Sequence, residues 1–328
     1  MRAAFIERLG PPEAIHYGEL ATPRPGPADV LVDVTATAVN HVDTFVRSGA
    51  WRTPIDFPFV IGRDLAGTVV ETGSDVHGFR PGDPVWCNSL GHAGRQGAAA
   101  ERAVVPVDRL YRMPDGVSAA EVVAVAHPAA TAHLALFTHG RLRDSETVVV
   151  AGAAGNVGSA LVVLAAAAGA RVIATAAARD AGYCRSLGAS EVIDYTDPAV
   201  PERVRAAAPD GVDVFIDTAG RNDLSSSVDL LANRGRIVVL AGMRTRPVLP
   251  VGPLYLRDRS VVGFAISQAT TTELAHAAGT INRSLATGCL RARKTETLPL
   301  SAAASAHRRV EAGGTSSTKL VLRPDLDP

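Results

Sequence analysis

The sequence predicts an α/β protein of two domains, in which a doubly wound parallel sheet is joined to a small β-barrel. The 328 residues exceed what one ordinary hydrophobic core encloses. The middle of the chain alternates apolar strands with helical segments, whereas the first third is rich in β-branched runs and turns. A glycine-rich loop stands between the first apolar strand of the middle part and the helix that follows.

The N-terminal third has the pattern of strands separated by tight turns. Val30–Val34 and Gly67–Glu71 are β-branched runs that favour strands. Pro and Gly clusters at Pro23–Pro27, Gly73–Asp75 and Arg80–Asp83 break the chain around them. We therefore expect a small barrel here, with little helix before about residue 118.

The middle of the chain predicts a parallel sheet that is covered on both faces. Continuous apolar strands, rather than alternating ones, are typical of such sheets. A helix rich in Ala, Val and Leu is expected over Asn156–Ala168. The expected strands are Thr147–Ala151, Arg171–Thr175, Glu191–Ile193, Val212–Asp217, Arg236–Leu240 and Ser260–Phe264.

The C-terminal part predicts two helices, Glu273–Thr287 and Ser301–Glu311, and a last strand, Lys319–Leu322. We expect this tail to return to the first domain. The predicted division is a catalytic domain of residues 1–122 and 267–328 around a central domain of residues 123–266.

Composition indicates which binding partners and which cellular compartment to expect. Lys plus Arg and Asp plus Glu both number 33, so the balanced charge favours neither nucleic acid nor an anionic membrane surface. No uncharged apolar run reaches about 18 residues and charge comes early, so we expect no membrane span and no signal peptide. Three widely spaced cysteines, Cys87, Cys184 and Cys289, fit a reducing cytoplasm.

The strongest motif is the loop Val150-Ala151-Gly152-Ala153-Ala154-Gly155-Asn156-Val157-Gly158, between a predicted strand and a predicted helix. Gly155 would let the backbone approach a pyrophosphate, and Gly158 would let the helix pack closely on the strand. The free N–H groups of the helix start would bind the phosphates. The commonest fingerprint has a glycine where Ala153 stands, and a tight turn that binds nothing is the alternative.

The end of the second strand favours NADPH over NADH. Proteins that bind NAD usually carry Asp or Glu about 20 residues after the loop, where it holds the ribose 2′-hydroxyl. Here that segment is Thr175-Ala176-Ala177-Ala178-Arg179, without a carboxylate. Arg179 could bind a 2′-phosphate through two hydrogen bonds. The alternative is an exposed arginine at a helix start.

The chain as a whole resembles the zinc-independent quinone oxidoreductases, the zeta-crystallin-like group of the medium-chain dehydrogenase/reductase superfamily. The similarity extends almost from end to end and depends on several short motifs. These are Asn40–Gly49, Ile61–Val69, Phe79–Val85 with Pro84 replacing the usual Arg, Ala151–Gly158, Leu187–Ala189 and Val192–Tyr195.

The resemblance implies a GroES-like β-barrel catalytic domain and a Rossmann domain, with the cofactor in the cleft between them. It implies that Asn40, in the active-site segment with Asp43, lies beside the nicotinamide or the substrate carbonyl. Further cofactor contacts follow from it: Thr131 on the nicotinamide-ribose side, Tyr195 and Arg179 at the adenosine phosphate, Lys319 near the cleft, and the backbone of Leu240, Gly242, Phe264 and Ile266 around the nicotinamide.

The substrate pocket departs from the family at two aromatic positions. Phe45 stands where the family often has tyrosine, and Trp51 stands where it has another aromatic residue. The phenol hydroxyl lost at Phe45 removes a possible donor to the substrate. His92 lies on a Gly-rich segment, Leu90–Gly97, which is either a cover for the site or a flexible loop.

No metal is expected. A catalytic zinc needs three protein ligands and an open position. In the zinc branch of the superfamily these ligands would stand at Asn40, at Arg63 and at a later cysteine. Asn is a poor zinc ligand and Arg cannot be one, and the four-cysteine lobe of that branch is absent from the sequence.

These observations predict an enzyme that transfers hydride from NADPH to a small conjugated acceptor. Without a metal, an unactivated ketone cannot be polarised strongly, whereas a quinone or an α,β-unsaturated carbonyl spreads the incoming charge. The Asn40 amide and backbone N–H groups would stabilise that charge, and solvent would supply the proton. The alternatives are an enone or enoyl-thioester reductase of secondary metabolism and a non-enzymatic NADPH-binding protein.

A homodimer is expected through the last strand of the central domain. Ser260–Phe264 is apolar and short and would lie at the edge of the sheet, where natural proteins cover or pair an open strand. Members of the resembled family commonly pair these edges across a two-fold axis. The alternative is that the chain's own loop, Met243–Tyr255, covers the edge.

Overall fold

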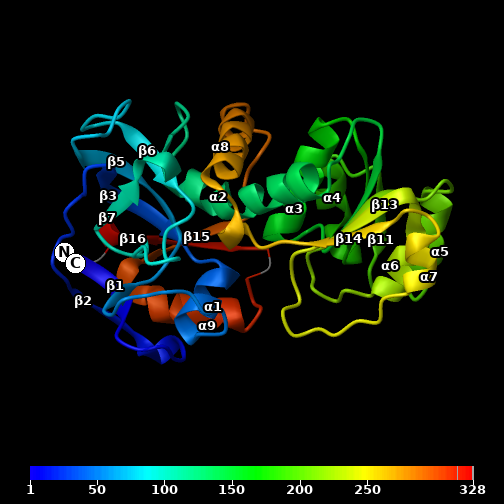
Figure 1. Cartoon of the computed structure of the whole chain (residues 1–328), viewed down its shortest axis with the longest axis horizontal. Helices are drawn as coiled ribbons and strands as arrows, with labels where there is room; N and C mark the ends of the chain where they lie inside the picture. Colours follow the sequence, from blue (N-terminus) through cyan, green and yellow to red (C-terminus); the bar gives the residue numbers. More distant parts are fainter. Residues whose placement is uncertain (316, 327–328) are drawn as a thin grey trace. The chain divides into compact units, whose positions relative to one another are not determined.

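The computed structural model describes residues 1–315 and 317–326 (Figure 1). The chain divides into two compact units. Unit 1 comprises Met1–His127 and Thr270–Pro328, and unit 2 comprises Pro128–Ala269. The fold therefore combines a unit built mainly from strands with a unit built on a parallel sheet, as the sequence predicts.

Unit 1 is built mainly from strands. They are β1 (Arg2–Ile6), β2 (Ile15–Glu19), β3 (Asp29–Ala38), β4 (Phe59–Val60), β5 (Asp64–Thr72), β6 (Pro84–Cys87), β7 (Arg102–Pro106), β8 (Tyr111–Arg112), β15 (Thr295–Pro299) and β16 (Lys319–Arg323). The α-helices are α1 (His41–Ser48), the first part of α2 (Ala119–His133), α8 (Thr271–Ala286) and α9 (Ala303–Glu311).

Strand β3 is the centre of the seven-stranded sheet of unit 1. It pairs antiparallel with β5, β7 and β16, so a strand from the C-terminal part of the chain lies in the same sheet as strands from the N-terminal third. In this register Ala38 faces both Val321 of β16 and Asp64 of β5. The residues just beyond Ala38 are thereby brought against two distant segments, and the polar cluster described below forms there.

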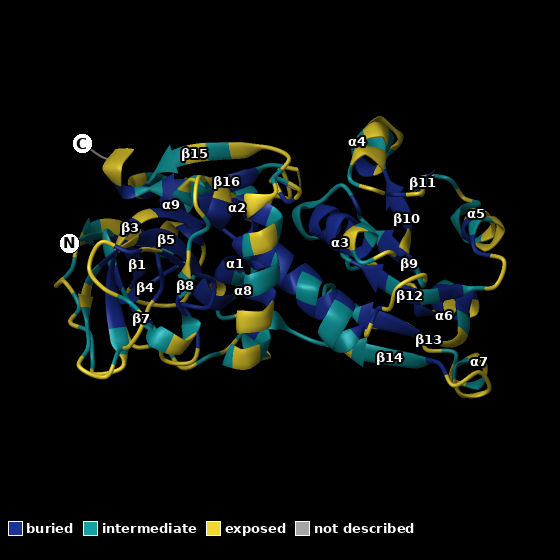
Figure 2. Ribbon diagram, turned by 90° about the horizontal axis from the view of Figure 1, so that it is seen from above, coloured by how far each residue is buried: buried dark blue, intermediate teal, exposed yellow. Residues whose placement is uncertain are grey.

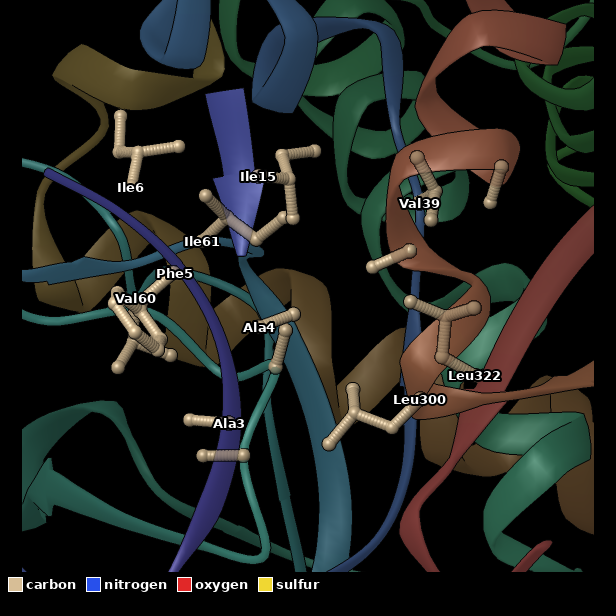
Figure 3. Close-up of a cluster of buried hydrophobic side chains, with 14 of the residues drawn as sticks. Ala3, Ala4, Phe5, Ile6, Ile15, Val39, Val60, Ile61, Leu300 and Leu322 are labelled. Atoms are coloured by element: carbon tan, nitrogen blue, oxygen red, sulfur yellow. The ribbon is translucent and has the colours of Figure 1, made fainter. Parts of the chain in front are cut away.

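A buried apolar cluster holds the N-terminal strand against the C-terminal segments (Figure 3). Ile6 of β1 packs in it with Leu300 and Leu322, although almost the whole chain separates them in sequence. Burying one such side chain stabilises the fold by about 1.5–3 kcal/mol. Helix α9 lies beside α1 (Figure 1), so the same contacts fix the start of α1.

Helix α1 was not foreseen from the sequence pattern, which indicated little helix in this third of the chain. It begins after Asn40, whose backbone N–H donates to the carboxylate of Asp43 at 2.7 Å. It ends at Gly49, where φ is 79°, a left-handed conformation that favours glycine. Asn before the first turn and Asp three residues later are the sequence signal for this start.

Unit 2 is a six-stranded parallel sheet with helices between its strands. The strands are β9 (Thr147–Ala151), β10 (Arg171–Ala176), β11 (Glu191–Asp194), β12 (Val212–Asp217), β13 (Leu231–Val239) and β14 (Ser260–Gly263). The helices are the last part of α2, α3 (Asn156–Ala167), α4 (Ala181–Ser186), α5 (Val200–Ala207), α6 (Leu224–Leu230) and α7 (Val251–Tyr255).

The strand order of unit 2 is β11-β10-β9-β12-β13-β14, so the direction of winding reverses after β9. Sheets of this kind bind ligands outside the carboxyl ends of the strands, at the point of reversal. The glycine loop leaves β9 at that point.

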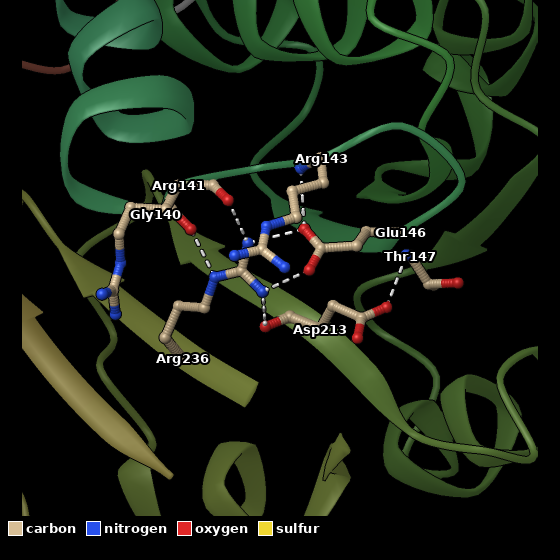
Figure 4. Close-up of polar contacts among 7 residues, drawn as sticks. All are labelled: Gly140, Arg141, Arg143, Glu146, Thr147, Asp213 and Arg236. Atoms are coloured by element: carbon tan, nitrogen blue, oxygen red, sulfur yellow. Dashed lines mark hydrogen bonds and ion pairs between the residues drawn. The ribbon is translucent and has the colours of Figure 1, made fainter. Parts of the chain in front are cut away.

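A buried arginine ties the connection before β9 to the middle of the sheet (Figure 4). Arg236 of β13 donates to the carbonyl oxygens of Gly140 and Arg141 and makes two hydrogen bonds to Glu146, at 2.8 and 2.6 Å. Paired guanidinium–carboxylate contacts of this type are strong and directional. The contacts brace the amino end of the sheet, away from the edge that carries the glycine loop.

The sequence predicts no membrane span, and the helical segment Ala119–His139 bears on that prediction. It comprises α2 and a π-helical turn, Leu134–His139, and among the described residues it is the one helix long and apolar enough to cross a membrane. Its most apolar window is 78% buried within the fold. A core helix of this kind passes the same test of length and composition, so the segment carries little weight as a membrane span.

Candidate active site

The glycine loop lies between β9 and α3, the strand–turn–helix context that its sequence predicts. Gly152 has φ of 78°, and a Cβ there would lie 2.6 Å from Oγ1 of Thr218. A Cβ on Gly158 would lie 2.1 Å from the carbonyl oxygen of Gly152, so only glycine lets α3 pack this closely on β9. Gly155 precedes α3 in extended conformation, and the N–H groups of Asn156 and Val157 begin the helix.

The carboxyl ends of β9 to β12 border a cavity of about 690 Å³. Gly152, Thr175 and Tyr195, three of the residues predicted to bind cofactor, line it. The carbonyl oxygen of Thr175 accepts hydrogen bonds from the N–H groups of Gly152 and Ala153, so the loop is fixed against the end of β10. Asp217, at the end of β12, also lines the cavity and accepts hydrogen bonds from three backbone N–H groups of the next loop.

The cations near this cavity differ from the predicted set. Arg179 lies in an exposed 3-10 turn, Ala178–Asp180, and is not among the residues that line the cavity. Arg221, in the loop after β12, lines it and places its guanidinium 5.3 Å from the centre of the Tyr195 ring. The sequence reasoning missed Arg221, because nothing local marks a loop arginine as the neighbour of a tyrosine in the turn after another strand, β11.

Three of the residues predicted around the nicotinamide, Leu240, Gly242 and Phe264, follow the carboxyl ends of strands β13 and β14. Leu240 directly follows β13, and Phe264 follows β14 and stacks on His139 at 4.4 Å. Gly242 has φ of 84°, and a Cβ there would lie 2.4 Å from Nδ2 of Asn222. Ile266 begins a 3-10 turn and Thr131 is buried in α2.

Unit 1 holds a buried polar cluster around Asn40. The Nδ2 of Asn40 donates to Oδ2 of Asp64 at 2.9 Å, and Nζ of Lys319 donates to Oδ1 of Asn40. His127 lies against the same carboxylate, with Nδ1 3.8 Å from Oδ1 of Asp64. The guanidinium of Arg63 is buried beside Asp43 and Asp64. Its Nε and Nη2 have no hydrogen-bond partner in the described part of the chain.

Burial controls the ionisation of this cluster. It raises the pKa of Asp43 to about 6, although the Arg63 cation and the Asn40 N–H oppose the shift. It likewise raises the pKa of Asp64, and the Lys319 ammonium opposes it. Burial lowers the pKa of Lys319, whereas both carboxylates favour its charged form. Perturbed groups that face one another in this way are typical of functional sites.

The geometry separates the roles of Asn40 and Asp43. Both were predicted to be catalytic, but the carboxylate of Asp43 accepts the backbone N–H of Asn40 and is 3% exposed. Asp43 therefore holds the start of α1 in place. Asn40 retains one side-chain N–H beyond the one that it gives to Asp64.

The three predicted pocket residues lie close to one another in unit 1. The N–H of Trp51 donates to the carbonyl oxygen of Phe45 at 3.0 Å. The Trp51 ring meets the His92 ring edge-on, with 6.4 Å between centroids. His92 is buried with Nδ1 unpartnered in the described structure, and burial together with Arg63 lowers its pKa to about 4.

The segment that carries His92 is held by hydrogen bonds. The N–H of Ala93 donates to Oγ1 of Thr53 at 2.8 Å, and that of Gly94 donates to the carbonyl oxygen of Pro54 at 2.9 Å. Gln96 donates to the carbonyl oxygen of Pro58 at 3.2 Å. The Gly-rich segment is thus fastened to the chain that follows Trp51.

Comparison with known proteins agrees with this architecture. Residues 26–115 match the alcohol dehydrogenase GroES-like domain, and residues 156–280 match the zinc-binding dehydrogenase family. The quinone oxidoreductase of Mus musculus is 31% identical, with 98% of this chain and 97% of that protein covered.

Solved structures share this fold over almost the whole chain. A NAD-dependent alcohol dehydrogenase superposes with a TM-score of 0.88 at 32% identity, covering 98% of this chain and 99% of that one. Escherichia coli quinone oxidoreductase complexed with NADPH superposes with a TM-score of 0.85 at 25% identity, covering 99% of this chain and all of that one.

The barrel-and-Rossmann architecture and its glycine loop define a medium-chain dehydrogenase/reductase that binds a nicotinamide cofactor. Within that superfamily the chain belongs to the quinone oxidoreductase group. It is therefore an oxidoreductase of the quinone reductase type that acts on a small molecule.

Proposed function

We propose that the protein reduces quinones and other conjugated carbonyls with NADPH and without a metal. The observation that carries the proposal is the buried guanidinium of Arg63 beside Asp43 and Asp64. Arg63 stands where the zinc branch of the superfamily would have a metal ligand, and a guanidinium cannot act as one.

The donor set around Asn40 does not fit zinc, although one matching family is described as zinc-binding. The amide oxygen of Asn40 already accepts a hydrogen bond from Lys319. Among the described residues, no group of three or more His, Cys, Asp and Glu side chains is placed to hold a metal ion. The proposed reaction therefore contains no metal-dependent step.

The chain's own residues would supply binding and charge stabilisation. The glycine loop, with Gly152, Ala154, Gly155 and Asn156, would hold the pyrophosphate at the start of α3. When bound, NADPH supplies a hydride from its nicotinamide. The remaining N–H of Asn40 would donate to the acceptor oxygen that gains charge, and Phe45, Trp51 and His92 would line the acceptor site.

Burial sets what His92 can do in that site. Its pKa of about 4 keeps the ring neutral at pH 7, so it can donate a hydrogen bond but cannot supply a proton as an acid. Solvent remains the proposed source of the proton. A conjugated acceptor suits such a site, because its reduced anion is delocalised and needs no metal.

NADPH is the proposed cofactor. The end of β10 carries no carboxylate at the ribose position, and the guanidinium of Arg221 lies over the Tyr195 ring at the cavity, whereas Arg179 lies outside the cavity lining. A carboxylate there would repel a 2′-phosphate, whereas a guanidinium binds it. The NADPH complex of the Escherichia coli relative supports this choice.

We further propose a homodimer through β14, in a reducing cytoplasm. Among the described residues no strand pairs with the outer edge of β14. The segment before it exposes large apolar side chains, and helix α7 there is mostly exposed (Figure 2). These side chains are Met243, Val248, Val251, Tyr255 and Leu256. An open edge strand and exposed apolar side chains in the same unit favour association with a second copy.

An acceptor panel tests the proposed function. NADPH oxidation would be followed with 1,4-benzoquinone, with an α,β-unsaturated ketone and with a saturated ketone. Turnover of the first two and not the third is expected. The ratio of kcat/KM for the quinone and the enone identifies the preferred class of acceptor, and fast turnover of the saturated ketone would overturn the proposal.

A further inference from the structure

Three residues from distant parts of unit 1 form one buried hydrogen-bond chain. Lys319 of β16 donates to the side-chain oxygen of Asn40, and the side-chain nitrogen of Asn40 donates to Asp64 of β5 at 2.9 Å. The three residues are 3%, 6% and 0% exposed. The chain is therefore shielded from the water that would weaken its electrostatic interactions.

The register of the sheet explains the contact. Strands β3 and β16 run antiparallel with Ala38 facing Val321, so Asn40, two residues further, faces Lys319. On the other side Ala38 faces Asp64. The sheet pairing itself places one cation and one carboxylate on the two ends of the Asn40 amide.

These two neighbours determine what the amide can do. Lys319 fixes the oxygen and Asp64 accepts one N–H, so the amide cannot turn over without losing both bonds. An ammonium at the carbonyl oxygen also draws electron density from the nitrogen. The remaining N–H becomes a stronger donor, since hydrogen bonds of a chain polarise one another in a low-dielectric interior.

The charges around Lys319 support its ionised form. Burial lowers the pKa of Lys319, the nearby carboxylates of Asp64 and Asp43 oppose that shift, and Arg63 interacts with the same two carboxylates. Buried ion pairs contribute little to the stability of the fold, because the cost of desolvating the charges offsets their attraction. The cost of burying this group is better explained by a task at Asn40 than by a gain in stability.

We propose that Lys319 is a positioning residue that orients and polarises the Asn40 amide as donor to the acceptor oxygen. This inference rests on the proposed function, in which Asn40 is that donor. It differs from the role that the family resemblance implies for Lys319, namely a contact with the cofactor.

A double-variant experiment separates the two roles. Lys319→Met should lower kcat for a quinone at least about tenfold, or 1.4 kcal/mol of transition-state stabilisation. The Kd of NADPH, measured by fluorescence titration, should change less than about twofold. Because Lys319 acts through Asn40, the variant Lys319→Met/Asn40→Ala should be no slower than Asn40→Ala alone.

Other results would overturn the inference. A tenfold weaker NADPH Kd with unchanged kcat at saturating NADPH would make Lys319 a cofactor contact. Multiplying losses in the double variant would show that Lys319 acts independently of Asn40. If the wild-type enzyme fails to oxidise NADPH with any of the conjugated acceptors, the proposed function itself is wrong. That outcome is distinct from a failure of the inference about Lys319.

Two further variants serve as controls for folding and charge. Circular dichroism and the Tm should show that Lys319→Met folds. Lys319→Gln keeps a donor without the charge and should lose most of the same kcat, whereas Lys319→Arg keeps the charge and should recover it in part. If the Met variant does not fold, Gln and Arg variants with equal kcat would contradict the role of the charge.

Discussion

The guanidinium of Arg221 lies over the ring of Tyr195, with 5.3 Å between its central carbon and the ring centre. Both side chains line the cavity at the carboxyl ends of β9 to β12. Tyr195 is 44% exposed, so the pair stands at the mouth of that cavity and not in the core. A cation held on an aromatic face is well placed to meet a phosphate.

Replacing Arg221 by Ala should weaken NADPH binding about tenfold, or roughly 1.4 kcal/mol, as expected for one charge-assisted contact. The Kd of NADH should change less than about twofold, because NADH has no 2′-phosphate. Arg179→Ala is the matched control; since Arg179 lies outside the lining of the cavity, it should cost less. Equal losses for both cofactors would mean that Arg221 supports the fold or the adenine instead.

Substitutions at two glycines of the glycine loop should affect different properties, stability at Gly158 and NADPH binding at Gly155. A Cβ on Gly158 would lie 2.1 Å from backbone, so Gly158→Ala should lower the Tm, with a cost of about 1–3 kcal/mol for the forced shift. Gly155 has φ of −77° and ψ of 172°, which any residue adopts. Gly155→Val should therefore fold and lose NADPH binding. Normal NADPH binding by that variant would make the loop only a turn.

The buried His307 of α9 should make stability depend on pH. Burial and the neighbouring Arg47 lower its pKa to about 3, and its Nδ1 has no hydrogen-bond partner in the described chain. An unfolded histidine has a pKa of about 6.5, so below that pH the unfolded chain binds a proton that the folded chain excludes. Its contribution to stability is complete above pH 6.5 and is lost as the pH falls toward 3.

Urea unfolding at several pH values measures this effect. Below about pH 6.5, His307 should contribute a slope of up to about 1.4 kcal/mol per pH unit, and His307→Gln should remove that slope. Asp43, whose pKa is raised to about 6, contributes in the opposite direction in both proteins and cancels in the comparison. Parallel curves for the two proteins would show that His307 is protonated in the fold.

Local chemistry made part of this structure predictable. Strands β9 and β12 have the bounds that continuous apolar runs indicate, and the glycine loop has the predicted strand–turn–helix context. The Lys319–Asn40 contact was not predictable, because it depends on the register of two strands far apart in sequence. Helix α1 carried a local signal, Asn40 followed by Asp43, that was interpreted as catalytic chemistry and not as a cap.

The dimer proposal predicts a mass near twice 34.0 kDa by light scattering at micromolar concentration. The N–H of Phe264 donates to β13, and N–H groups alternate in direction along a strand, so the N–H of Val261 points to the outer edge of β14. Val261→Pro would remove that donor, so the mass should fall toward that of the monomer. A dimer that persists in Val261→Pro would place the interface elsewhere, and a monomer that does not change on concentrating would rule out the dimer.

We expect this site to reduce a conjugated acceptor through fixed protein charges and without a metal. The most direct test is steady-state NADPH oxidation with 1,4-benzoquinone, before and after exhaustive dialysis against a chelator, with zinc content measured on the same samples. Unchanged kcat/KM with far less than one zinc per chain is the predicted result. Activity that disappears on chelation and returns with stoichiometric zinc would contradict the account.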